Sequence, residues 1–463
     1  MNLLFVGNDS AVTRRIDSIS TAAGFKFYSV KNGFDALNRI HLYPIQVIIV
    51  SDKQQLMSVH DIIKKLNAQK SYFLVFTYVE KKSIPQLYSL LTAGNDRWLF
   101  HDSSDDELLN VLKYIYSKPL DFLKIERLRF QINRKFGINN LIGSSPQMTD
   151  LYRDLEITIG TDITVLIQGE SGSGKELIAR LLHLASPRKN NRFVGLNCAA
   201  IPRELMESEL FGYEKGAFTG AANAKTGKFQ IADRGTLFLD EIADMDIILQ
   251  SKILRMLEQQ EFERIGSNDT LRADVRILSA SNKILENEID EQRFRMDLFY
   301  RINSYTIHLP ALRERKADLI PLLVHFVQKN NIRNKRKIEW IADEALNRLL
   351  EHPWSGNIRE LENVLARSTL FSTGSIITNE TINRTIQTSP KSVRTAPTAA
   401  NPPPERPMPV VTIAEMEKQA ILNALDESKG NMTRAAKNLG LSRVTIWRKI
   451  EKYELKNQIK EKS

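Results

Sequence analysis

The stretch ITVLIQGESGSGKELIARLLH, residues 163 to 183, decides the fold of the central part of the chain. A strand-like apolar run leads into a glycine-rich turn, and a helix-like run follows it. This is the context that a phosphate-binding loop requires, because glycines let backbone N–H groups close on phosphates at a helix N-terminus. We therefore predict ATP binding by the loop residues Gly169, Glu170, Ser171, Gly172, Ser173, Gly174, Lys175 and Glu176. Lys175 is expected to supply positive charge to the β- and γ-phosphates.

The strand-like run TLFLD, residues 236 to 240, adds the groups that hydrolysis needs. It ends in Asp240 and Glu241, and carboxylates at the tip of a buried strand are costly unless a cation or an attacking water needs them. We expect Asp240 to hold hydrated Mg²⁺ and Glu241 to polarise the water. Asn282 follows a third apolar run and would sense the γ-phosphate. One position departs from the general motif, since Glu176 replaces the usual magnesium-binding Ser or Thr.

Composition describes a globular chain with conventional cores. The chain has 463 residues, 42% of them hydrophobic, and a formal net charge of +10. Its single cysteine, Cys198, cannot form an internal disulfide, and no signal segment or long uncharged run is evident. These features predict a cytoplasmic protein without a membrane partner.

The chain divides into three units and two connectors, which predicts an α/β multidomain fold. Residues 1–120 and 141–388 both alternate strand-like and helix-like runs, as parallel α/β sheets do, and the second unit becomes a helical lid from about residue 315. Residues 121–140 are expected to form a helical connector. Residues 389–409 are rich in proline and predict a linker, and residues 410–463 form the third unit.

Residues 141 to 370 closely resemble the AAA+ domain of the sigma-54-dependent transcription activators, the bacterial enhancer-binding proteins. Glu176 is usual in that family, so it does not count against ATP binding. The resemblance implies that Asn197, in FVGLNCAA, restrains the catalytic Glu241. It also implies that Arg359, in WSGNIRELEN, contacts nucleotide in the same subunit.

Arg295 and Arg301, in FRMDLFYRIN, fall on the arginine-finger positions of the family. The resemblance implies that they reach the γ-phosphate of a neighbouring subunit, which makes hydrolysis depend on a ring. A homo-oligomer, from a dimer to a hexameric ring, is therefore expected. Taken singly, each of these arginines would be read as part of a solvated helix face with ion pairs; together and in the family's order they favour the functional role.

The stretch GYEKGAFTGA, residues 212 to 221, contains the loop by which the family contacts sigma-54. Its six residues are Gly216, Ala217, Phe218, Thr219, Gly220 and Ala221. Glycine permits backbone angles closed to other residues, so the loop can rise or fold while an exposed Phe218 offers an apolar contact. The alternative is a turn whose Phe packs into the core. A second loop, near residues 261 to 268, is expected to move with the first.

The C-terminal unit has helix-turn-helix spacing and resembles the Fis-type DNA-binding domain. From residue 429 to the end there are ten Lys or Arg and three acidic residues, as expected of a surface that binds phosphates. Ser442 is the expected N-cap of the second helix, and an enhancer DNA is the expected partner. The candidate DNA-contacting residues are Ser442, Arg443, Thr445, Arg448 and Lys449. A helical bundle with solvated charges is the alternative.

Residues 1–120 resemble a receiver domain, with its flavodoxin-like fold, but lack most of the acidic pocket. An ungapped alignment places the acid pair on Gly7 and Asn8, beside Asp9, and the phosphoacceptor on Ser51. The switch lysine falls on His101, and only Thr77 matches; a register shift of one would bring Asp52 to the acceptor position. We expect control by a partner or ligand without aspartyl phosphorylation, as in flagellar regulators of this family with degenerate receivers. A purely structural domain is the alternative.

These features together predict an ATP-dependent transcription activator. It would bind enhancer DNA, assemble a ring and remodel the sigma-54 RNA polymerase holoenzyme from the closed to the open complex. One alternative is a DNA-binding repressor or cofactor whose AAA+ core only oligomerises. Another is a AAA+ enzyme that acts on other proteins, which the Fis-like end disfavours.

Overall fold

The computed structural model describes residues 1–387 except 54–55, 70–72, 81–82, 118–140 and 219–220, together with residue 424. The chain separates into one compact unit at residues 1–392 and a second at residues 393–463. The DNA-contacting candidates of the sequence, the linker and the whole helical connector therefore lie outside the described residues. Within the described part, no helix is long and apolar enough to cross a membrane.

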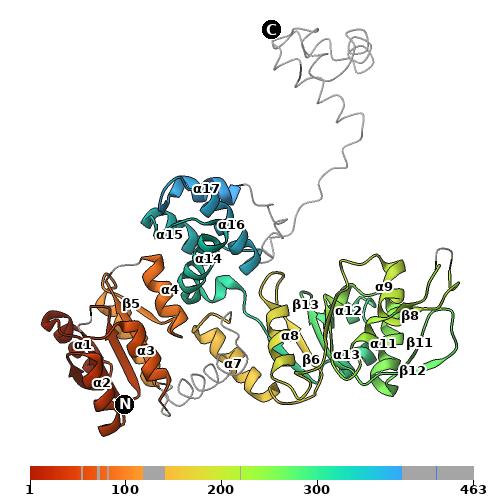
Figure 1. The fold of residues 1–463 in the computed structure, drawn as a ribbon, viewed down its shortest axis with the longest axis horizontal. Helices are drawn as coiled ribbons and strands as arrows, with labels where there is room; N and C mark the ends of the chain where they lie inside the picture. The colour runs from red at the N-terminus through yellow and green to blue at the C-terminus, as the bar shows by residue number, and fades with distance from the viewer. Residues whose placement is uncertain are drawn as a thin grey trace, which may run out of the picture. The chain divides into compact units, whose positions relative to one another are not determined.

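The N-terminal domain is a parallel five-stranded sheet in the order β2-β1-β3-β4-β5, flanked by helices on both faces (Figure 1). Apolar runs such as Val47–Ser51 are buried along their whole length, because both faces of a parallel sheet are covered. The strands are β1 (Asn2–Val6), β2 (Lys26–Val30), β3 (Val47–Ser51), β4 (Leu74–Val79) and β5 (Trp98–Phe100). The helices are α1 (Ser10–Ala22), α2 (Gly33–Leu42), α3 (Val59–Asn67), α4 (Ile84–Thr92) and α5 (Asp105–Ser117).

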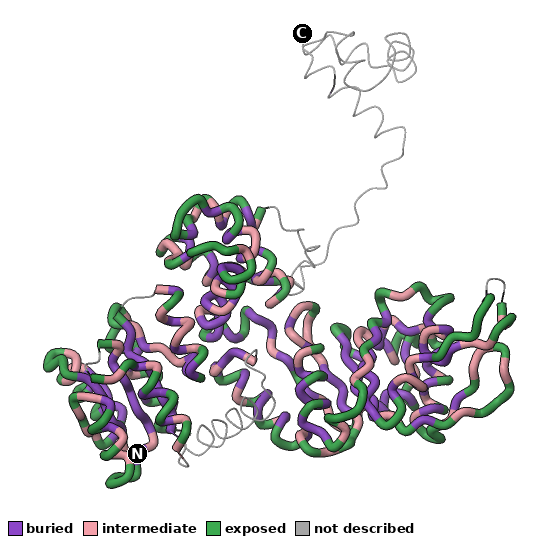
Figure 2. The backbone as a smooth tube through the Cα atoms, viewed as in Figure 1, coloured by how far each residue is buried: buried purple, intermediate pink, exposed green. Residues whose placement is uncertain are grey.

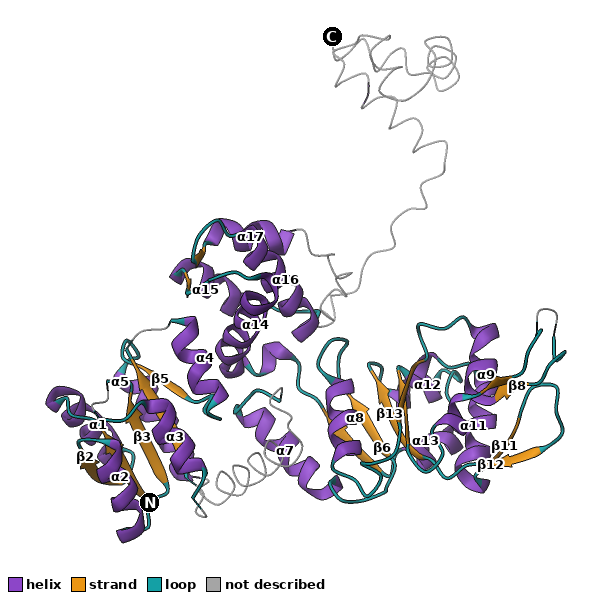
Figure 3. Ribbon diagram, in the orientation of Figure 1, coloured by secondary structure: helices purple, strands orange, loops and turns teal. Residues whose placement is uncertain are grey.

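The central domain has a second parallel sheet, in the order β14-β6-β13-β10-β7 (Figure 3). Its strands are β6 (Val165–Gln168), β7 (Phe193–Asn197), β10 (Thr236–Asp240), β13 (Arg276–Ser281) and β14 (Tyr305–His308). Val165 and Ile167 pack with α7 (Pro146–Thr158) and α8 (Lys175–Leu184), whereas Leu166 belongs to the core on the other face. That other core is formed with α9 (Arg203–Phe211), α11 (Ile247–Gln259), α12 (Leu285–Asp290) and α13 (Met296–Ile302).

Short elements project from this core. The antiparallel pairs are β8 (Gly212–Tyr213) with β9 (Lys225–Thr226) and β11 (Glu261–Glu263) with β12 (Thr270–Arg272). The remaining short helices are α10 (Lys228–Ile231), η1 (Ile242–Asp244), η2 (Leu312–Glu314) and η3 (Lys316–Asp318). Because β8 leads directly into the GAFTGA loop, the loop is anchored at its base by strand pairing.

The lid is helical, as predicted from the sequence. Its helices are α14 (Leu319–Asn334), α15 (Asp343–Glu351), α16 (Asn357–Phe371) and α17 (Asn379–Gln387), with one small parallel pair, β15 (Trp340–Ile341) and β16 (Ile376–Ile377). Trp354, just before α16, is buried and its indole N–H donates to the carbonyl of Leu349 at 2.9 Å. The loop before α16 is thereby fixed against α15.

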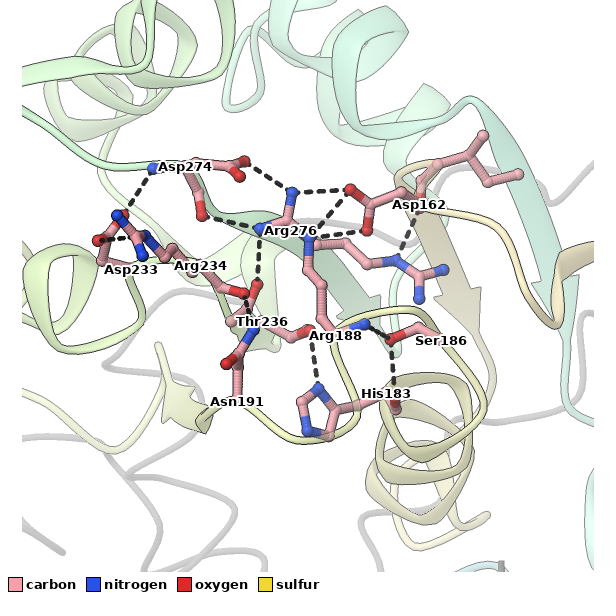
Figure 4. Close-up of polar contacts among 12 residues, drawn as sticks. Asp162, His183, Ser186, Arg188, Asn191, Asp233, Arg234, Thr236, Asp274 and Arg276 are labelled. Carbon is pink, nitrogen blue, oxygen red and sulfur yellow. Dashed lines mark hydrogen bonds and ion pairs between the residues drawn. The ribbon is translucent and has the colours of Figure 1, made fainter. Parts of the chain in front are cut away.

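The N-terminal ends of the central strands are joined by an arginine cluster (Figure 4). Arg188 donates to the carboxylates of Asp162 and Asp274, and these bonds raise the pKa of its guanidinium. Arg276, at the start of β13, is buried and donates to the carbonyls of Ile163 and Leu182. The cluster lies at the strand ends opposite those that carry the predicted nucleotide residues.

The face of the receiver-like sheet that carries α4 shares one hydrophobic core with the lid. Ile84 and Leu87 of α4 belong to the same buried cluster as Leu322 and Leu323 of α14. The backbone N–H of Ile84 also donates to the carbonyl of Glu339 at 2.8 Å. Figure 2 shows buried residues along the strands of both sheets and along α14.

Candidate ATP site and sigma-factor loop

The glycine-rich loop lies between β6 and α8, where the sequence predicts it. Gly172 and Gly174 have φ angles of 75° and 110°, in the region that favours glycine. A Cβ added at Gly172 would lie 2.4 Å from the carbonyl oxygen of Gly356 in the lid, so the close approach of the lid requires glycine there. The hydroxyl of Ser173 is buried and has no partner among the described residues, which leaves it free for a phosphate oxygen.

Lys175 and Glu241 form a buried ion pair. The Lys175 side chain is 6% exposed, and its Nζ lies 3.1 Å from Oε1 of Glu241 and 3.0 Å from the carbonyl oxygen of Gly169. The backbone N–H of Asn282 donates to the other Glu241 oxygen at 3.0 Å. Three residues predicted from separate strands therefore meet at one edge of the sheet. Because Lys175 is the cation paired with Glu241, a triphosphate would compete with Glu241 for Lys175.

Asp240 lies at the end of β10 and pairs with Asn197 at the end of β7. Oδ2 of Asp240 accepts from the Asn197 amide at 2.9 Å, and Oδ1 accepts the backbone N–H of Glu241 at 3.1 Å. The sequence analysis placed Asn197 opposite Glu241. In this structure that pairing is not formed, because Glu241 is turned toward Lys175 and Asn282 while Asn197 bonds its direct neighbour in the sheet.

The lid contacts the phosphate-binding loop through a network that the sequence analysis missed in part. Both Glu170 oxygens accept from Arg313, and the buried amide of Asn357 donates to Glu170 and to the carbonyl of Ser171. The bonds from Arg313 and Asn357 lower the pKa of the Glu170 carboxyl. Arg359 donates to the Ser171 hydroxyl at 3.2 Å, which places this predicted residue at the loop.

A signal for Asn357 was present in WSGNIRE, since Asn is among the residues that tolerate a positive φ and Asn357 has φ 53°. Arg313 carried no such signal, because its partner is 143 residues away in the sequence. Glu176, in contrast, points to solvent and pairs with Arg180 one helical turn later.

A cavity of about 520 Å³ adjoins the phosphate-binding loop. Ser173 and Gly174 form one side, Leu177 of α8 another, and Leu322 and Phe326 of α14 line the lid side. The wall is largely apolar, as is usual in pockets that bury a flat ring. This is the natural place for a nucleotide base whose phosphates lie on Gly169–Lys175.

The two finger arginines lie outside this site. Arg295 is the residue before α13 and forms an ion pair with Asp297, with N–O distances of 3.0 and 2.6 Å. Arg301 is exposed and donates to the carbonyl of Leu257. Neither contacts the phosphate-binding residues of its own chain in these interactions, as a role in a neighbouring site requires.

The GAFTGA loop rests on the second loop, between β11 and β12. Glu214 accepts from Arg264, its N–H donates to the carbonyl of Ile265, and the N–H of Gly216 donates to Ala221. Phe218 is 43% exposed, and its ring meets the edge of Tyr213 with centroids 5.0 Å apart. Phe218 is therefore not a core residue. Thr219 and Gly220 lie outside the described residues.

The two candidate phosphoacceptor residues lie at the end of β3 in the receiver-like domain. Ser51 is the last residue of β3 and is buried, whereas Asp52 follows it and interacts, together with Asp9, with Lys53. Asp52 and Asp9 therefore both lie near Lys53, whereas the Ser51 side chain lies next to Gly7. One Asp52 oxygen accepts from the backbone N–H of Glu80 at 2.8 Å and from the Gln86 amide.

The acid-pair position is closed to a side chain. A Cβ on Gly7 would lie 2.7 Å from the Phe5 ring, so an acid there would displace that ring. Over the described part of the chain, no group of three or more His, Cys, Asp or Glu residues is arranged to hold a metal ion.

Family models and relatives agree with this geometry. The sigma-54 interaction domain matches residues 141–308, the AAA+ ATPase lid domain residues 313–399 and the Fis family of bacterial regulatory proteins residues 412–453. The transcriptional regulatory protein ZraR of Klebsiella oxytoca is 34% identical over 98% of this chain and 99% of its own length. The chain belongs to the sigma-54-dependent transcription activators.

A second curated relative agrees with this assignment. The regulatory protein AtoC of Escherichia coli is 34% identical over 97% of both chains. The crystal structure of NtrX from Brucella abortus in complex with ATP is 27% identical, covers 97% of this chain and 99% of that one, and has a TM-score of 0.49. This activator is an ATPase with a receiver-like N-terminal domain and a DNA-binding helix-turn-helix.

Proposed function

We propose that this chain assembles into a ring on enhancer DNA and uses ATP hydrolysis to convert the sigma-54 RNA polymerase holoenzyme from the closed to the open complex. The observation that carries the proposal is the half-exposed Phe218 at the end of a loop anchored to the ATPase core. A large apolar side chain held out to solvent on a family-matched loop suits a protein partner. A cytoplasmic location follows from these partners.

The ATP site would work by exchanging partners of Glu241. Lys175 binds Glu241 in this structure, and the phosphates of ATP would draw Lys175 away. The released carboxylate then takes a proton from the attacking water as general base. Asn197, which bonds Asp240 one strand away, would move the short distance to Glu241 to restrain it between cycles. Arg295 and Arg301 would complete the site of the next subunit.

Mg²⁺ fits this site through Asp240. Both oxygens of this carboxylate accept one hydrogen bond and keep a lone pair, and a single carboxylate is what Mg²⁺ takes when phosphates and waters supply its other ligands. Bound there, the ion would neutralise charge on the β- and γ-phosphates.

The receiver-like domain would act without aspartyl phosphorylation. An acidic residue at position 7 would displace the Phe5 ring. One Asp52 oxygen accepts hydrogen bonds from the backbone N–H of Glu80 and from the Gln86 amide. A partner or ligand at this domain would supply the signal. We keep the DNA contacts of Ser442, Arg443, Thr445, Arg448 and Lys449 as part of the proposal.

The substitution Thr219→Ala tests the loop. Removing one hydroxyl from this loop should leave ATPase activity within about twofold and reduce open-complex formation at least about tenfold, the effect of losing about 1.4 kcal/mol or more of contact. ATP turnover measures the ATPase activity, and permanganate footprinting of the promoter measures open-complex formation. Open-complex formation at the wild-type level would show that the loop is not the contact.

A further inference from the structure

One wall residue of the cavity beside the phosphate-binding loop comes from a different domain. Tyr88, on α4 of the receiver-like domain, lines the same 520 Å³ cavity as Ser173 and Gly174. Across from it stand Leu322 and Phe326 of the lid.

The position of Tyr88 is fixed from both sides of α4. On the lid side, its neighbour Leu87 is buried in the core shared with α14, and Tyr88 packs against that core. On the receiver side, the carbonyl of Ser89 is bonded by the His60 ring at 2.8 Å, and Gln86 donates to Asp52. The helix that carries Tyr88 is therefore held by packing on one side and by hydrogen bonds on the other.

The chemistry of the wall suits a purine. Leu177, Leu322, Ile358 and Phe326 give it an apolar surface. Burial, with a smaller effect of Lys329, lowers the pKa of His325 and so favours its neutral imidazole. Flat aromatic rings bind in such walls by stacking or edge contacts. The cavity keeps its 520 Å³ with Tyr88 in place, so the tyrosine is a wall of the site and does not plug it.

We propose that Tyr88 of the receiver-like domain binds the base of ATP, so that the nucleotide site of this activator is completed by its regulatory domain. The inference rests on nucleotide binding at residues 169–176. It goes beyond the proposed function, because it makes ATP affinity depend on how α4 is seated. A signal that moves α4 would then change ATP affinity directly.

Calorimetric titration of the full chain with ATP and with inorganic tripolyphosphate tests this. Tyr88→Ala should weaken ATP binding three- to tenfold and leave tripolyphosphate binding within twofold, because the latter has no base. Tyr88→Phe keeps the ring and should match the wild type for both ligands. The control is Tyr114→Ala, an exposed tyrosine of α5 that does not line the cavity.

Unchanged or tighter ATP binding by Tyr88→Ala would overturn the inference and leave the ATP site intact. A wild-type chain that binds neither ligand would overturn the site and the inference together.

If Tyr88→Ala fails to fold, hydrogen exchange of the wild-type chain tests the contact between Tyr88 and the base without any variant. ATP should slow exchange in α4, Ile84–Thr92, at least threefold more than tripolyphosphate does. Equal exchange in α4 with both ligands would contradict a contact between the receiver-like domain and the base.

Discussion

At the scale of single residues, the ATP site is organised by carboxylates whose partners differ. Glu241 is held by Lys175, Asp240 by Asn197 and Glu170 by Arg313. The identities of the first two carboxylates follow from the sequence, because they end an apolar strand after a phosphate-binding loop. Their partners do not, because side-chain pairing among three strand ends depends on sheet order, which the sequence alone leaves open.

Glu241→Gln isolates the general base. The amide keeps the shape of the carboxylate but accepts a proton poorly, so turnover should fall at least about 100-fold while ATP binding persists. Steady-state turnover and ATP titration of the same preparation measure the two effects. Asp244→Asn, an acid three residues away that pairs with Lys283, is the matched control and should keep turnover. Turnover of Glu241→Gln near the wild-type level would remove Glu241 from this role.

Glu170 links the stability of the lid contact to pH. Its bonds from Arg313 and Asn357 lower its pKa in the folded chain, so its contribution is present above the unfolded pKa and is lost as pH falls through the folded pKa. Glu170→Gln should therefore lower the free energy of unfolding at pH 7 by about 0.5–1 kcal/mol, since the pair is half-exposed. The difference should vanish in acid, where the Glu170 carboxyl is protonated in the folded chain as well. Denaturant titrations at pH 7 and in acid measure it, and an equal difference at both would exclude the ionised pair as its cause.

At the scale of elements, the GAFTGA loop is one arm of a paired structure. Its base is the strand pair β8–β9, and Glu214 and Ile265 connect it to the loop between β11 and β12. The sequence predicts that the GAFTGA loop can move, because its glycines permit unusual backbone angles, and it predicts that a second loop moves with it. It does not predict that the Tyr213 ring contacts the Phe218 ring. Two aromatic residues five positions apart come into contact only when the backbone between them turns back.

The substitution Tyr213→Ala tests this ring contact. Without the ring, Phe218 loses its aromatic contact, and we expect open-complex formation to fall about three- to tenfold while ATPase activity stays within about twofold. Tyr213→Phe keeps the edge-to-face contact and should behave as the wild type. Both variants are measured on one promoter. Equal activation by Tyr213→Ala and Tyr213→Phe would show that the contact between the Tyr213 and Phe218 rings has no part in presenting Phe218.

At the scale of the whole molecule, the three-part organisation follows from composition. Each part leaves a pattern in the sequence: strands and helices alternate in two segments, a proline-rich break follows them, and the end of the chain is basic. The shared core of α4 and α14 leaves none, because Ile84 and Leu87 have the same apolar spacing whether α4 faces solvent, a partner or the lid. The choice between Ser51 and Asp52 stays open in the sequence for a similar reason: adjacent residues at a strand end differ in direction, and only the fold shows that Ser51 is buried.

Asp52→Asn tests control without phosphorylation in the full chain. Asparagine still accepts from the N–H of Glu80, so α4 should keep its place, and open-complex formation should stay within about twofold of the wild type with or without acetyl phosphate. Stimulation of the wild type by acetyl phosphate that Asp52→Asn abolishes would restore a phosphoacceptor role to Asp52.

The most direct test of the central claim is open-complex formation in a purified system. It contains the full chain, sigma-54 holoenzyme, a promoter with its enhancer, and either ATP or a non-hydrolysable analogue, without a phosphodonor. We predict opening with ATP and none with the analogue, and loss of opening when the enhancer is removed. Equal opening with both nucleotides, or none with ATP from a chain that hydrolyses ATP and binds the enhancer, would contradict the account.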